Sequence, residues 1–303
     1  METVDELAGI RWRQGLQARW PRLWLDLPRP RMLGVLNNAD QPVPPRTRVL
    51  ATPLGAKLAN LPSGRSLPVP YATPFQLGQG AVELLPSGTS AGGTLVRLFA
   101  KNQAVLVVNT ASLQALPSAQ PLQLREADVL VVDATLADEP PLDVETVWQA
   151  LHRRQNQQEP HIWLLEHPLL TLDLLLKAQE PLRLAGRLER LAERARQAGL
   201  AMPDARKPGR KAQGLLLWPL EQENRLPEAW REVPRTVVAE KPRENHDFLR
   251  FTRRIAGAHL DELVHASGCK TVLAWGQGAQ VLAGRLTGVE SHVLRVPHQL
   301  PLV

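Results

Sequence analysis

Short apolar runs separated by proline and glycine make up most of the first 143 residues. Runs of this length that are rich in Val and Leu are typical of the short strands of a sheet. The predicted strands are 48–52, 82–85, 94–99, 104–109 and 128–133, and one helix is predicted at 53–60. The first half of the chain is therefore expected to form a sheet of many short strands.

From residue 144 the apolar positions adopt helical spacing that alternates with strand-length runs. Val147, Trp148 and Leu151 share one helical face, and 182–199 predicts a long amphipathic helix that ends at Gly199. The other predicted helices are 169–179, 260–267 and 279–286, and the predicted strands are 162–165, 215–218, 236–239 and 271–275. Strands that alternate with helices predict a layered α/β arrangement.

Length and composition narrow the class of protein. The chain has 303 residues, which fits two domains of ordinary size. Cys269 is the only cysteine, so an intramolecular disulfide and a cysteine-based zinc cluster are excluded. No apolar run approaches the roughly 20 residues that span a membrane. Glu2, Asp5 and Glu6 stand where a secretory signal would be positively charged. We expect a cytoplasmic protein without membrane contact.

The charge balance leaves a polyanionic partner open. The chain has 36 Lys and Arg against 30 Asp and Glu, a formal net charge of +6 that is mild for this length. Four cations gather in segment 203–213, namely Arg206, Lys207, Arg210 and Lys211. Two interpretations stay open for this exposed basic loop, a solvated linker, which the pattern alone favours, and a binding loop.

The segment Gly88-Thr89-Ser90-Ala91-Gly92 matches the G-x-S-x-G motif of serine hydrolases. In that motif the glycines allow a tight strand-to-helix turn that presents the serine hydroxyl. Asp133 and either His292 or His298 would complete a catalytic triad in the hydrolase order. The run that follows, 94–99, predicts a strand where the motif requires a helix. A serine hydrolase that uses Ser90 is therefore the alternative, and a glycine-rich loop between two strands is favoured.

Other candidate motifs are incomplete. Gly276-Gln277-Gly278 lies between a predicted strand and a predicted helix, but the third glycine of a dinucleotide fingerprint is replaced by Val281. A tight turn at a helix start is the favoured interpretation. The eight histidines all follow position 151 and form no group with the spacing of a metal centre. No metal and no cofactor are expected.

Several segments nevertheless follow one another in a recognisable order. Segment 24–28 is Trp-Leu-Asp-Leu-Pro, 34–41 is Gly-Val-Leu-Asn-Asn-Ala-Asp-Gln, and 84–98 begins Leu-Leu-Pro-Ser-Gly-Thr-Ser. The others are 49–53, 107–111, 128–136, 161–177, 184–191 and 272–276. In order and composition these segments resemble the metallo-β-lactamase/β-CASP nucleases. The resemblance is closest to the bacterial exonucleases associated with DNA ligase and helicase, relatives of Artemis and of the mRNA 3′-end cleavage factor.

The resemblance implies a fold with an inserted domain. It predicts a metallo-β-lactamase-like αββα sandwich formed by residues 1–140 and 246–303. A β-CASP-like α/β cap domain is expected to be inserted at 141–245. The chain would thus leave the first domain, form the cap and return.

The residues that would bind metal in this family are mostly replaced. In its His-x-His-x-Asp-His motif the three histidine positions hold Leu36, Asn38 and Gln41, and Asp40 remains. The full set of positions matched to metal ligands is Leu36, Asn38, Asp40, Gln41, Thr89, Ala111, Asp133, Arg254 and Trp275. Such nucleases use two metal ions to generate hydroxide and to brace the phosphate. The resemblance therefore implies a catalytically inactive homologue.

An inactive member of this family is expected to act by binding. The resemblance implies a scaffold subunit whose partner is an active nuclease, a helicase or a ligase, and nucleic acid is a second expected partner. The candidate phosphate contacts are Arg206, Lys207, Arg210, Lys211, Arg243, Arg250, Arg253 and Arg254. Arg254 could supply the charge of a lost metal. Surface ion pairs with Glu240 and Glu244 are the alternative role for these arginines.

Overall fold

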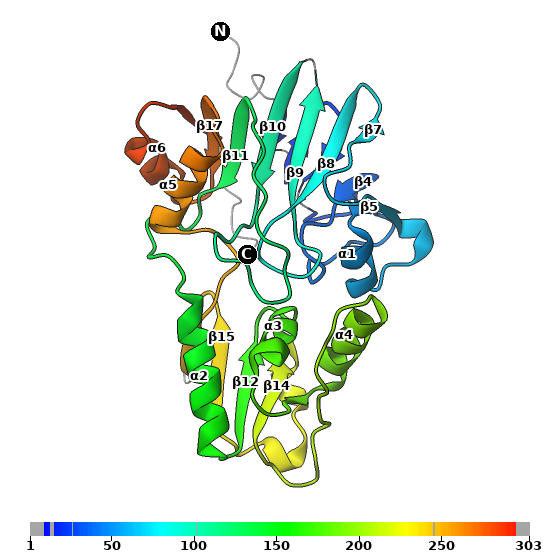
Figure 1. Cartoon of the computed structure of the whole chain (residues 1–303), viewed down its shortest axis with the longest axis vertical. Coiled ribbons are helices and arrows are strands. Elements are labelled where there is room, and N and C mark those ends of the chain that lie inside the picture. The colour runs from blue at the N-terminus through cyan, green and yellow to red at the C-terminus, as the bar shows by residue number, and fades with distance from the viewer. Residues whose placement is uncertain (1–8, 13–14, 26, 101, 245, 295–303) are drawn as a thin grey trace, which may run out of the picture. The chain divides into compact units, whose positions relative to one another are not determined.

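The chain folds into two compact units in a computed structural model that describes residues 9–12, 15–25, 27–100, 102–244 and 246–294 (Figure 1). Unit 1 consists of Met1–Ala115, Ala119–Pro141 and Arg253–Val303. Unit 2 consists of Leu116–Ser118 and Leu142–Thr252. Both units combine strands with helices, so the protein is of the mixed α/β class.

Unit 1 contains a first sheet, sheet A, with the strand order β1-β2-β3-β4-β5-β6. Its strands are β1 Ile10–Trp12, β2 Leu16–Ala18, β3 Leu23–Trp24, β4 Leu33–Val35, β5 Arg48–Ala51 and β6 Ser66–Pro68. β1, β2 and β3 pair antiparallel, and β3 to β6 pair parallel. Most of these strands have only two or three residues, which is why the apolar pattern predicted only β5.

The second sheet of unit 1, sheet B, has the order β18-β17-β11-β10-β9-β8-β7. Its strands are β7 Phe75–Leu77, β8 Gly80–Pro86, β9 Thr94–Ala100, β10 Gln103–Val108, β11 Val129–Asp133, β17 Thr271–Trp275 and β18 Glu290–Val293. Neighbouring strands from β7 to β10 are antiparallel, and those from β10 to β18 are parallel. The predicted strands at 82–85, 94–99, 104–109, 128–133 and 271–275 are confirmed.

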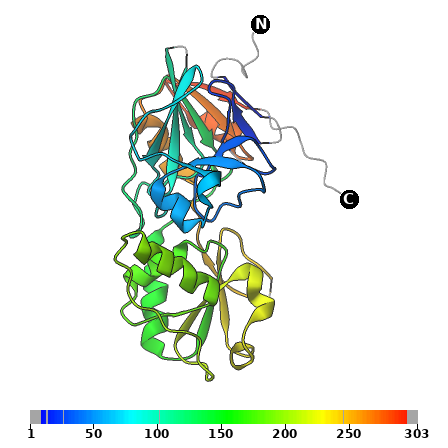
Figure 2. The same cartoon turned by 90° about the vertical axis from the view of Figure 1, so that its right-hand side faces the viewer.

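Unit 1 has four layers because both sheets bury both faces. Alternate residues of β11 show this, since Val131 packs into the core between the sheets and Leu130 packs toward the helical side. The helices are α1 Pro53–Leu58 against sheet A, and α5 Gly257–Ala266 and α6 Ala279–Arg285 against sheet B. A short 3₁₀ helix, η2, covers Ser63–Arg65. Figure 2 shows the blue strands of sheet A beside the cyan and green strands of sheet B.

Unit 2 contains a five-stranded parallel sheet in the order β13-β14-β12-β15-β16. Its strands are β12 His161–Leu165, β13 Arg183–Leu184, β14 Leu215–Pro219, β15 Arg235–Ala239 and β16 Asp247–Arg250. Its helices are α2 Val144–Gln157, α3 Leu170–Lys177, α4 Gly186–Gln197, and the 3₁₀ helices η3 Leu220–Arg225 and η4 Glu228–Trp230. Asp143 caps α2 by accepting a hydrogen bond from the Glu145 amide. Val147, Trp148 and Leu151 are buried on one face of α2, as the spacing predicted.

The long helix predicted at 182–199 begins later than expected. Arg183 and Leu184 form β13, which pairs parallel with β14, and Ala185 is extended before α4 starts at Gly186. The apolar side chain of Leu184 fits both the helical spacing and the buried edge of the sheet. Backbone pairing with Leu216 and Leu217 therefore decides its conformation.

The boundaries of the units differ in detail from those expected at 140/141 and 245/246. The return to unit 1 comes after Thr252, because β16 continues the sheet of unit 2. The segment Leu116–Ser118 belongs to unit 2, where the Ser118 amide donates to the buried carboxylate of Asp173 at 2.8 Å. In the part of the chain that the structure describes, no helix is long and apolar enough to cross a membrane.

The loop between β8 and β9, residues 87–93, requires its glycines. Gly88 and Gly92 have φ values of 76° and 72°, in the left-handed region that favours glycine. A Cβ on Gly88 would lie 2.4 Å from the Ser112 carbonyl oxygen, and one on Gly92 would lie 2.6 Å from the Gly55 nitrogen. Close backbone packing thus explains both glycines of the G-x-S-x-G segment.

Replacement of Gly88 by alanine tests this explanation. We expect Gly88→Ala to lower the free energy of unfolding by at least about 2 kcal/mol, because strained backbone and a clash with a carbonyl oxygen add. Gly64→Ala is the matched control, since a Cβ on Gly64 meets no atom within 4 Å. The control should change stability by less than about 1 kcal/mol in urea unfolding. Equal stability of the two variants would contradict the packing role of Gly88.

His161 makes the stability of unit 2 depend on pH. It is buried, its Nε2 lies 2.9 Å from Thr236 Oγ1, and burial together with the charge of Arg154 lowers its pKa to about 4, against a smaller opposing effect of Asp247. Between pH 6.5 and 4 the unfolded chain binds a proton at this residue and the folded chain does not. Stability contributed by neutral His161 is therefore present above pH 6.5 and is lost as the pH falls toward 4.

We expect this loss to reach about 3 kcal/mol in the native chain. His161→Gln removes the titrating group and should flatten the dependence of unfolding free energy on pH between 7 and 4. His246 acts in the opposite direction, because hydrogen bonds to the Glu244 carbonyl and to Glu223 raise its pKa. It is unchanged in the variant, so the difference between the two urea unfolding series isolates His161. Identical slopes would contradict this assignment.

Candidate functional site

Loops from distant parts of the chain bring several of the predicted ligand positions together in unit 1. Asn38 lies between β4 and β5, Thr89 between β8 and β9, and Thr110 two residues after the end of β10. The Ser112 amide donates to the Ser87 carbonyl at 3.0 Å, and the Thr94 amide donates to the Asn37 carbonyl at 2.9 Å. These backbone contacts hold the three loops against one another.

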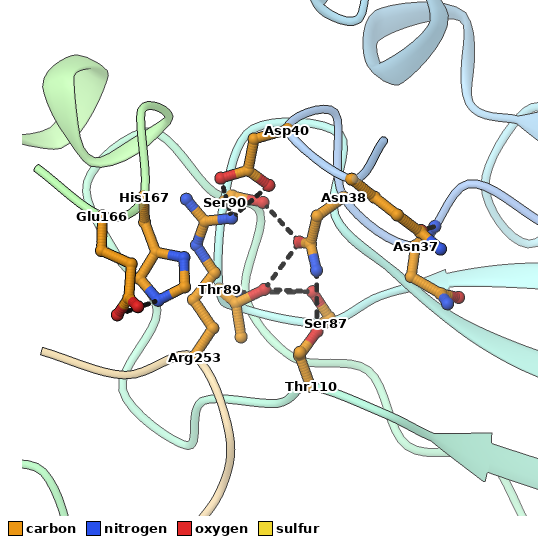
Figure 3. A network of polar contacts seen from close by, with 11 residues as sticks. Asn37, Asn38, Asp40, Ser87, Thr89, Ser90, Thr110, Glu166, His167 and Arg253 are labelled. Atoms are coloured by element: carbon orange, nitrogen blue, oxygen red, sulfur yellow. Dashed lines mark hydrogen bonds and ion pairs between the residues drawn. The ribbon is translucent and has the colours of Figure 1, made fainter. Parts of the chain in front are cut away.

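The side chain of Asn38 lies at the centre of this polar cluster (Figure 3). Its Oδ1 accepts hydrogen bonds from Ser90 Oγ at 2.9 Å and from Thr89 Oγ1 at 3.3 Å. Its Nδ2 donates to Thr110 Oγ1 at 3.1 Å. Ser87 Oγ lies 2.8 Å from Thr89 Oγ1. All these side chains except that of Thr110 are buried.

The donor and acceptor in each of these hydrogen bonds can be assigned because each hydroxyl has only one proton to donate. Thr89 gives its single hydroxyl proton to Asn38, so the Ser87 hydroxyl donates to Thr89. The lone pairs of Asn38 Oδ1 are thus taken by two hydroxyl protons. A metal ligand must instead offer its lone pair to the cation. The cluster is internally satisfied and is not arranged to coordinate a metal.

Asp40 forms an ion pair with Arg253. Arg253 Nη1 lies 2.6 Å from both carboxylate oxygens of Asp40, across 213 residues of sequence. The two side chains are only 5% and 13% exposed. A buried pair of this kind is destabilised strongly when one partner is removed, because the remaining charge stays unpaired. Arg253, one of the predicted phosphate contacts, therefore forms a mostly buried ion pair within unit 1.

Asp133 forms a second ion pair, with Arg254, the residue that follows Arg253. Arg254 Nε lies 3.1 Å from Asp133 Oδ2, and the Asp133 side chain is 4% exposed. The other oxygen, Oδ1, accepts from the Thr135 amide at 2.9 Å and from Thr135 Oγ1 at 2.5 Å. Asp133 and Arg254 are both positions that the resemblance matches to metal ligands. Arg254 therefore pairs with an acidic side chain at another of the matched positions.

The other predicted positions have structural surroundings. Leu36 and Ala111 are buried in apolar clusters, and Gln41 Oε1 accepts from the Asn37 amide at 3.0 Å within its own turn. The Trp275 ring lies 5.5 Å from the Trp12 ring and packs against the core between the sheets. None of these four side chains contacts the Asn38 cluster through a polar group that the structure records.

The residues present do not fit a two-metal centre. Three of the matched positions carry apolar or indole side chains, and the two carboxylates, Asp40 and Asp133, are each bound by an arginine. Among the described residues, no group of three or more His, Cys, Asp and Glu side chains could hold a metal ion.

Ser90 does not have the surroundings of a nucleophile. It is buried, and its hydroxyl donates to an amide oxygen instead of an imidazole. The residues after it form β9, so the loop joins two antiparallel strands and lacks the helix of a nucleophile elbow. His292 lies on β18 with its Nε2 2.9 Å from Glu290 Oε1, and His298 lies outside the described residues.

The second glycine motif also has a packing explanation. Gly276 has a φ of 98°, and a Cβ there would lie 2.4 Å from Thr135 Oγ1. A Cβ on Gly278 would lie 2.4 Å from the Ala134 carbonyl oxygen. The tight turn favoured from the sequence is therefore confirmed, and it lets residues 276–278 approach the loop after β11.

The remaining basic candidates belong to unit 2. Arg206, Lys207, Arg210 and Lys211 are exposed in the segment after α4, which has no helix or strand of its own beyond a bridge between Arg206 and Arg183. Arg243 is exposed and Arg250 is half-buried on β16. Four of the basic candidates thus lie in one exposed segment. Arg243 and Arg250 lie elsewhere in unit 2, and Arg250 is partly buried.

Sequence reasoning missed the partners that complete the polar cluster. Ser87, Thr110 and Asn37 were not among the candidates, although each lies within two residues of a matched position. Asn37 Nδ2 and Asn109 Nδ2 both donate to the Leu25 carbonyl at 2.9 Å, next to Asp26, which lies outside the described residues. The signal that could have identified them was their position in the same three loops.

Comparison with known proteins yields similarity at the level of structure. No protein-family model and no curated protein matches the chain. A solved structure of a protein of unknown function from Enterococcus faecalis V583 is similar to it, with a TM-score of 0.54 and 9% sequence identity. The similarity covers 80% of this chain and 74% of that chain. It shows a shared fold and carries no information on activity.

The Asp40–Arg253 pair can be tested by a double-mutant cycle. We expect Arg253→Gln to lower the free energy of unfolding by about 3 kcal/mol, because Asp40 keeps a charge in a mostly buried position. The double variant Asp40→Asn/Arg253→Gln removes both charges and should recover more than half of that loss. Urea unfolding of the full chain measures both values. With Asp40→Asn as the second single variant, losses in the two single variants that add up to the loss in the double variant would show that the pair is not coupled.

Proposed function

We propose that this chain is a catalytically inactive homologue of the metallo-β-lactamase/β-CASP nucleases. It acts as a scaffold or nucleic-acid-binding subunit of a DNA- or RNA-processing complex. In this proposal unit 1 corresponds to the metallo-β-lactamase-like domain. Unit 2 corresponds to the inserted β-CASP-like cap.

The four layers of unit 1 and the insertion of unit 2 support the proposed relationship. A helix, two face-to-face sheets and further helices are the layers that the resemblance predicts. The chain leaves unit 1 after Pro141 and returns at Arg253, as an inserted domain requires. The matched positions in 36–41 and 87–93 also meet, although about 50 residues separate them in sequence.

One observation carries the inactive character, namely that an arginine pairs with each of the two retained acidic positions. Arg253 and Arg254 are consecutive, and they compensate Asp40 and Asp133. Two positive charges thus take the place that two cations would have in an active relative. The polar positions that remain bond to one another through Asn38. A site satisfied in this way favours a stable fold that serves binding over hydrolysis of phosphodiesters.

The metal content of the purified full chain tests the inactive character. After equilibration with either metal and removal of unbound metal, we expect less than about 0.1 zinc or manganese per chain. Inductively coupled plasma mass spectrometry measures this content. No cleavage of labelled DNA or RNA is expected with either metal added. The control is Asp40→Asn/Asp133→Asn, which should have the same metal content as the native chain. Stoichiometric metal that is lost in this variant, together with cleavage by the native chain, would overturn the proposal.

Isolation of the protein from its own cells tests the scaffold role. A tagged full chain should co-purify with a nuclease, a helicase or a ligase in near-equal amount, and the association should persist after digestion of nucleic acid. A chain that remains monomeric and carries none of these enzymes would contradict the scaffold role. Association that depends on nucleic acid would favour the binding role.

A further inference from the structure

The excess positive charge of the protein lies in one segment of unit 2. Residues 183–213 contain nine Lys or Arg and three Asp or Glu, a net charge of +6. The whole chain also has a net charge of +6, so the rest of it carries 27 charges of each sign. The segment comprises β13, α4 and the loop that follows, which we call the basic segment. Only its last part, 203–213, was predicted from the sequence to be a basic loop.

Helix α4 presents arginines while it buries its apolar face. Leu188, Leu191, Ala192 and Ala195 are buried, and α4 packs beside α3 and β14 in unit 2 (Figure 1). Arg187, Arg190 and Arg194 follow at helical spacing on another face, where like charges destabilise the helix. Burial, and then the charges of Arg190 and Arg187, lower the pKa of Arg194. A bound anion would relieve this repulsion.

The loop after α4 is held in place by side chains. Arg183 Nε donates to the Gln213 carbonyl at 2.7 Å, and Arg183 Nη1 donates to the Lys207 carbonyl at 2.8 Å. The Leu184 amide donates to the Arg206 carbonyl at 2.9 Å. Arg183 therefore connects the two ends of segment 207–213. A fixed loop loses less conformational entropy on binding than a solvated linker does.

The start of the loop is fixed by a second arginine. Arg196 Nη2 donates to the Pro203 carbonyl at 2.7 Å and lies 3.8 Å from Asp204, and Arg196 Nη1 lies 3.1 Å from Glu193. Two cations of the segment thus position the loop and are not available to a ligand. These contacts argue against the interpretation of 203–213 as a solvated linker.

Five other cations of the basic segment have no acidic partner within 4 Å that the structure records: Arg190, Arg194, Arg206, Arg210 and Lys211. Arg187 pairs with Glu221, and Lys207 Nζ lies 3.5 Å from Glu189. The fixed loop and α4 therefore present at least four exposed or half-buried guanidinium groups in one stretch of chain. Guanidinium groups bind phosphate oxygens with two parallel hydrogen bonds.

We propose that the basic segment binds the phosphate backbone of a nucleic-acid duplex without reading its sequence. This assignment rests on the proposed binding role and names its partner. The segment contains no Phe, Tyr or Trp, so it offers no aromatic platform on which the bases of a single strand could stack. No exposed large hydrophobic side chain of the described residues lies in it, so it has nothing to insert into a membrane surface.

Fluorescence anisotropy with labelled 20-base-pair duplexes of DNA and of RNA tests the proposal on the full chain. If the five unpaired cations contact phosphates, the logarithm of affinity should fall with the logarithm of salt concentration at a slope of about −4 to −5. The triple variant Arg206→Gln/Arg210→Gln/Lys211→Gln should reduce the slope by about 3 and weaken binding at least about tenfold. The two duplexes distinguish DNA from RNA as the source of the phosphates.

The matched control removes the same charge from other exposed positions of unit 2. Arg225→Gln/Arg231→Gln/Lys241→Gln should keep the native slope and affinity within about twofold. A control that weakens binding as much as the triple variant would overturn the assignment to the basic segment. So would binding to phosphatidylserine vesicles or to single strands in preference to both duplexes. A native chain that binds none of these probes would overturn the proposal itself.

Arg183 has a positioning role that can be separated from its charge. Arg183→Lys keeps the charge and loses the two-point contact with the Lys207 and Gln213 carbonyls. It should weaken duplex binding several-fold with the salt slope unchanged. A changed slope or unchanged affinity would contradict this role. These readouts are independent of the metal measurement, so stoichiometric metal would overturn the inactive homologue and leave the duplex surface standing.

Discussion

The pairing of two buried carboxylates with two consecutive arginines is the constraint on which unit 1 depends. Asp40 and Asp133 come from different sheets, and an unpaired charge at either mostly buried position would destabilise the fold. Arg253 and Arg254 follow directly after unit 2 in the sequence. The segment that returns to unit 1 therefore also supplies the charges that balance its two carboxylates. In a metal enzyme the cations would come from solution. In this chain they are covalently part of the protein, and the fold therefore needs no ion to balance these two groups.

The sequence predicted the elements that have a clear apolar pattern. It missed those that are defined mainly by backbone hydrogen bonds to a neighbouring strand. β17 at Thr271–Trp275 was identified as a strand-length apolar run, and α2 by the helical spacing of its apolar residues. β3 and β13 have two residues each, too few for any period to be recognised. β16 contains only Phe248 and Leu249 as apolar residues, so no apolar pattern indicates that unit 2 extends to Thr252. Hydrogen bonds to a neighbouring strand define such elements, and no local pattern reports them.

The positions of the candidate site could be predicted from the sequence, but the contacts between its side chains could not. Its positions followed from a resemblance in the order of segments, which is a property of the sequence. Its chemistry depends on which side chains meet, and Asp40 and Arg253 are 213 residues apart. The sequence also gave no reason to separate Arg253 from the exposed arginines. Burial makes that distinction, since the guanidinium group of Arg253 is 5% exposed and is paired with Asp40.

The polar cluster of unit 1 and the basic segment of unit 2 have different structural requirements. The polar cluster around Asn38 needs close packing of three loops, and Gly88 and Gly92 permit that packing at the cost of backbone freedom. The basic segment needs the opposite, side chains that project from a fixed backbone. Arg183 and Arg196 fix this backbone by donating hydrogen bonds to loop carbonyls. Because the two regions belong to different units, changes that satisfy the charges of unit 1 leave the exposed cations of unit 2 available to a partner.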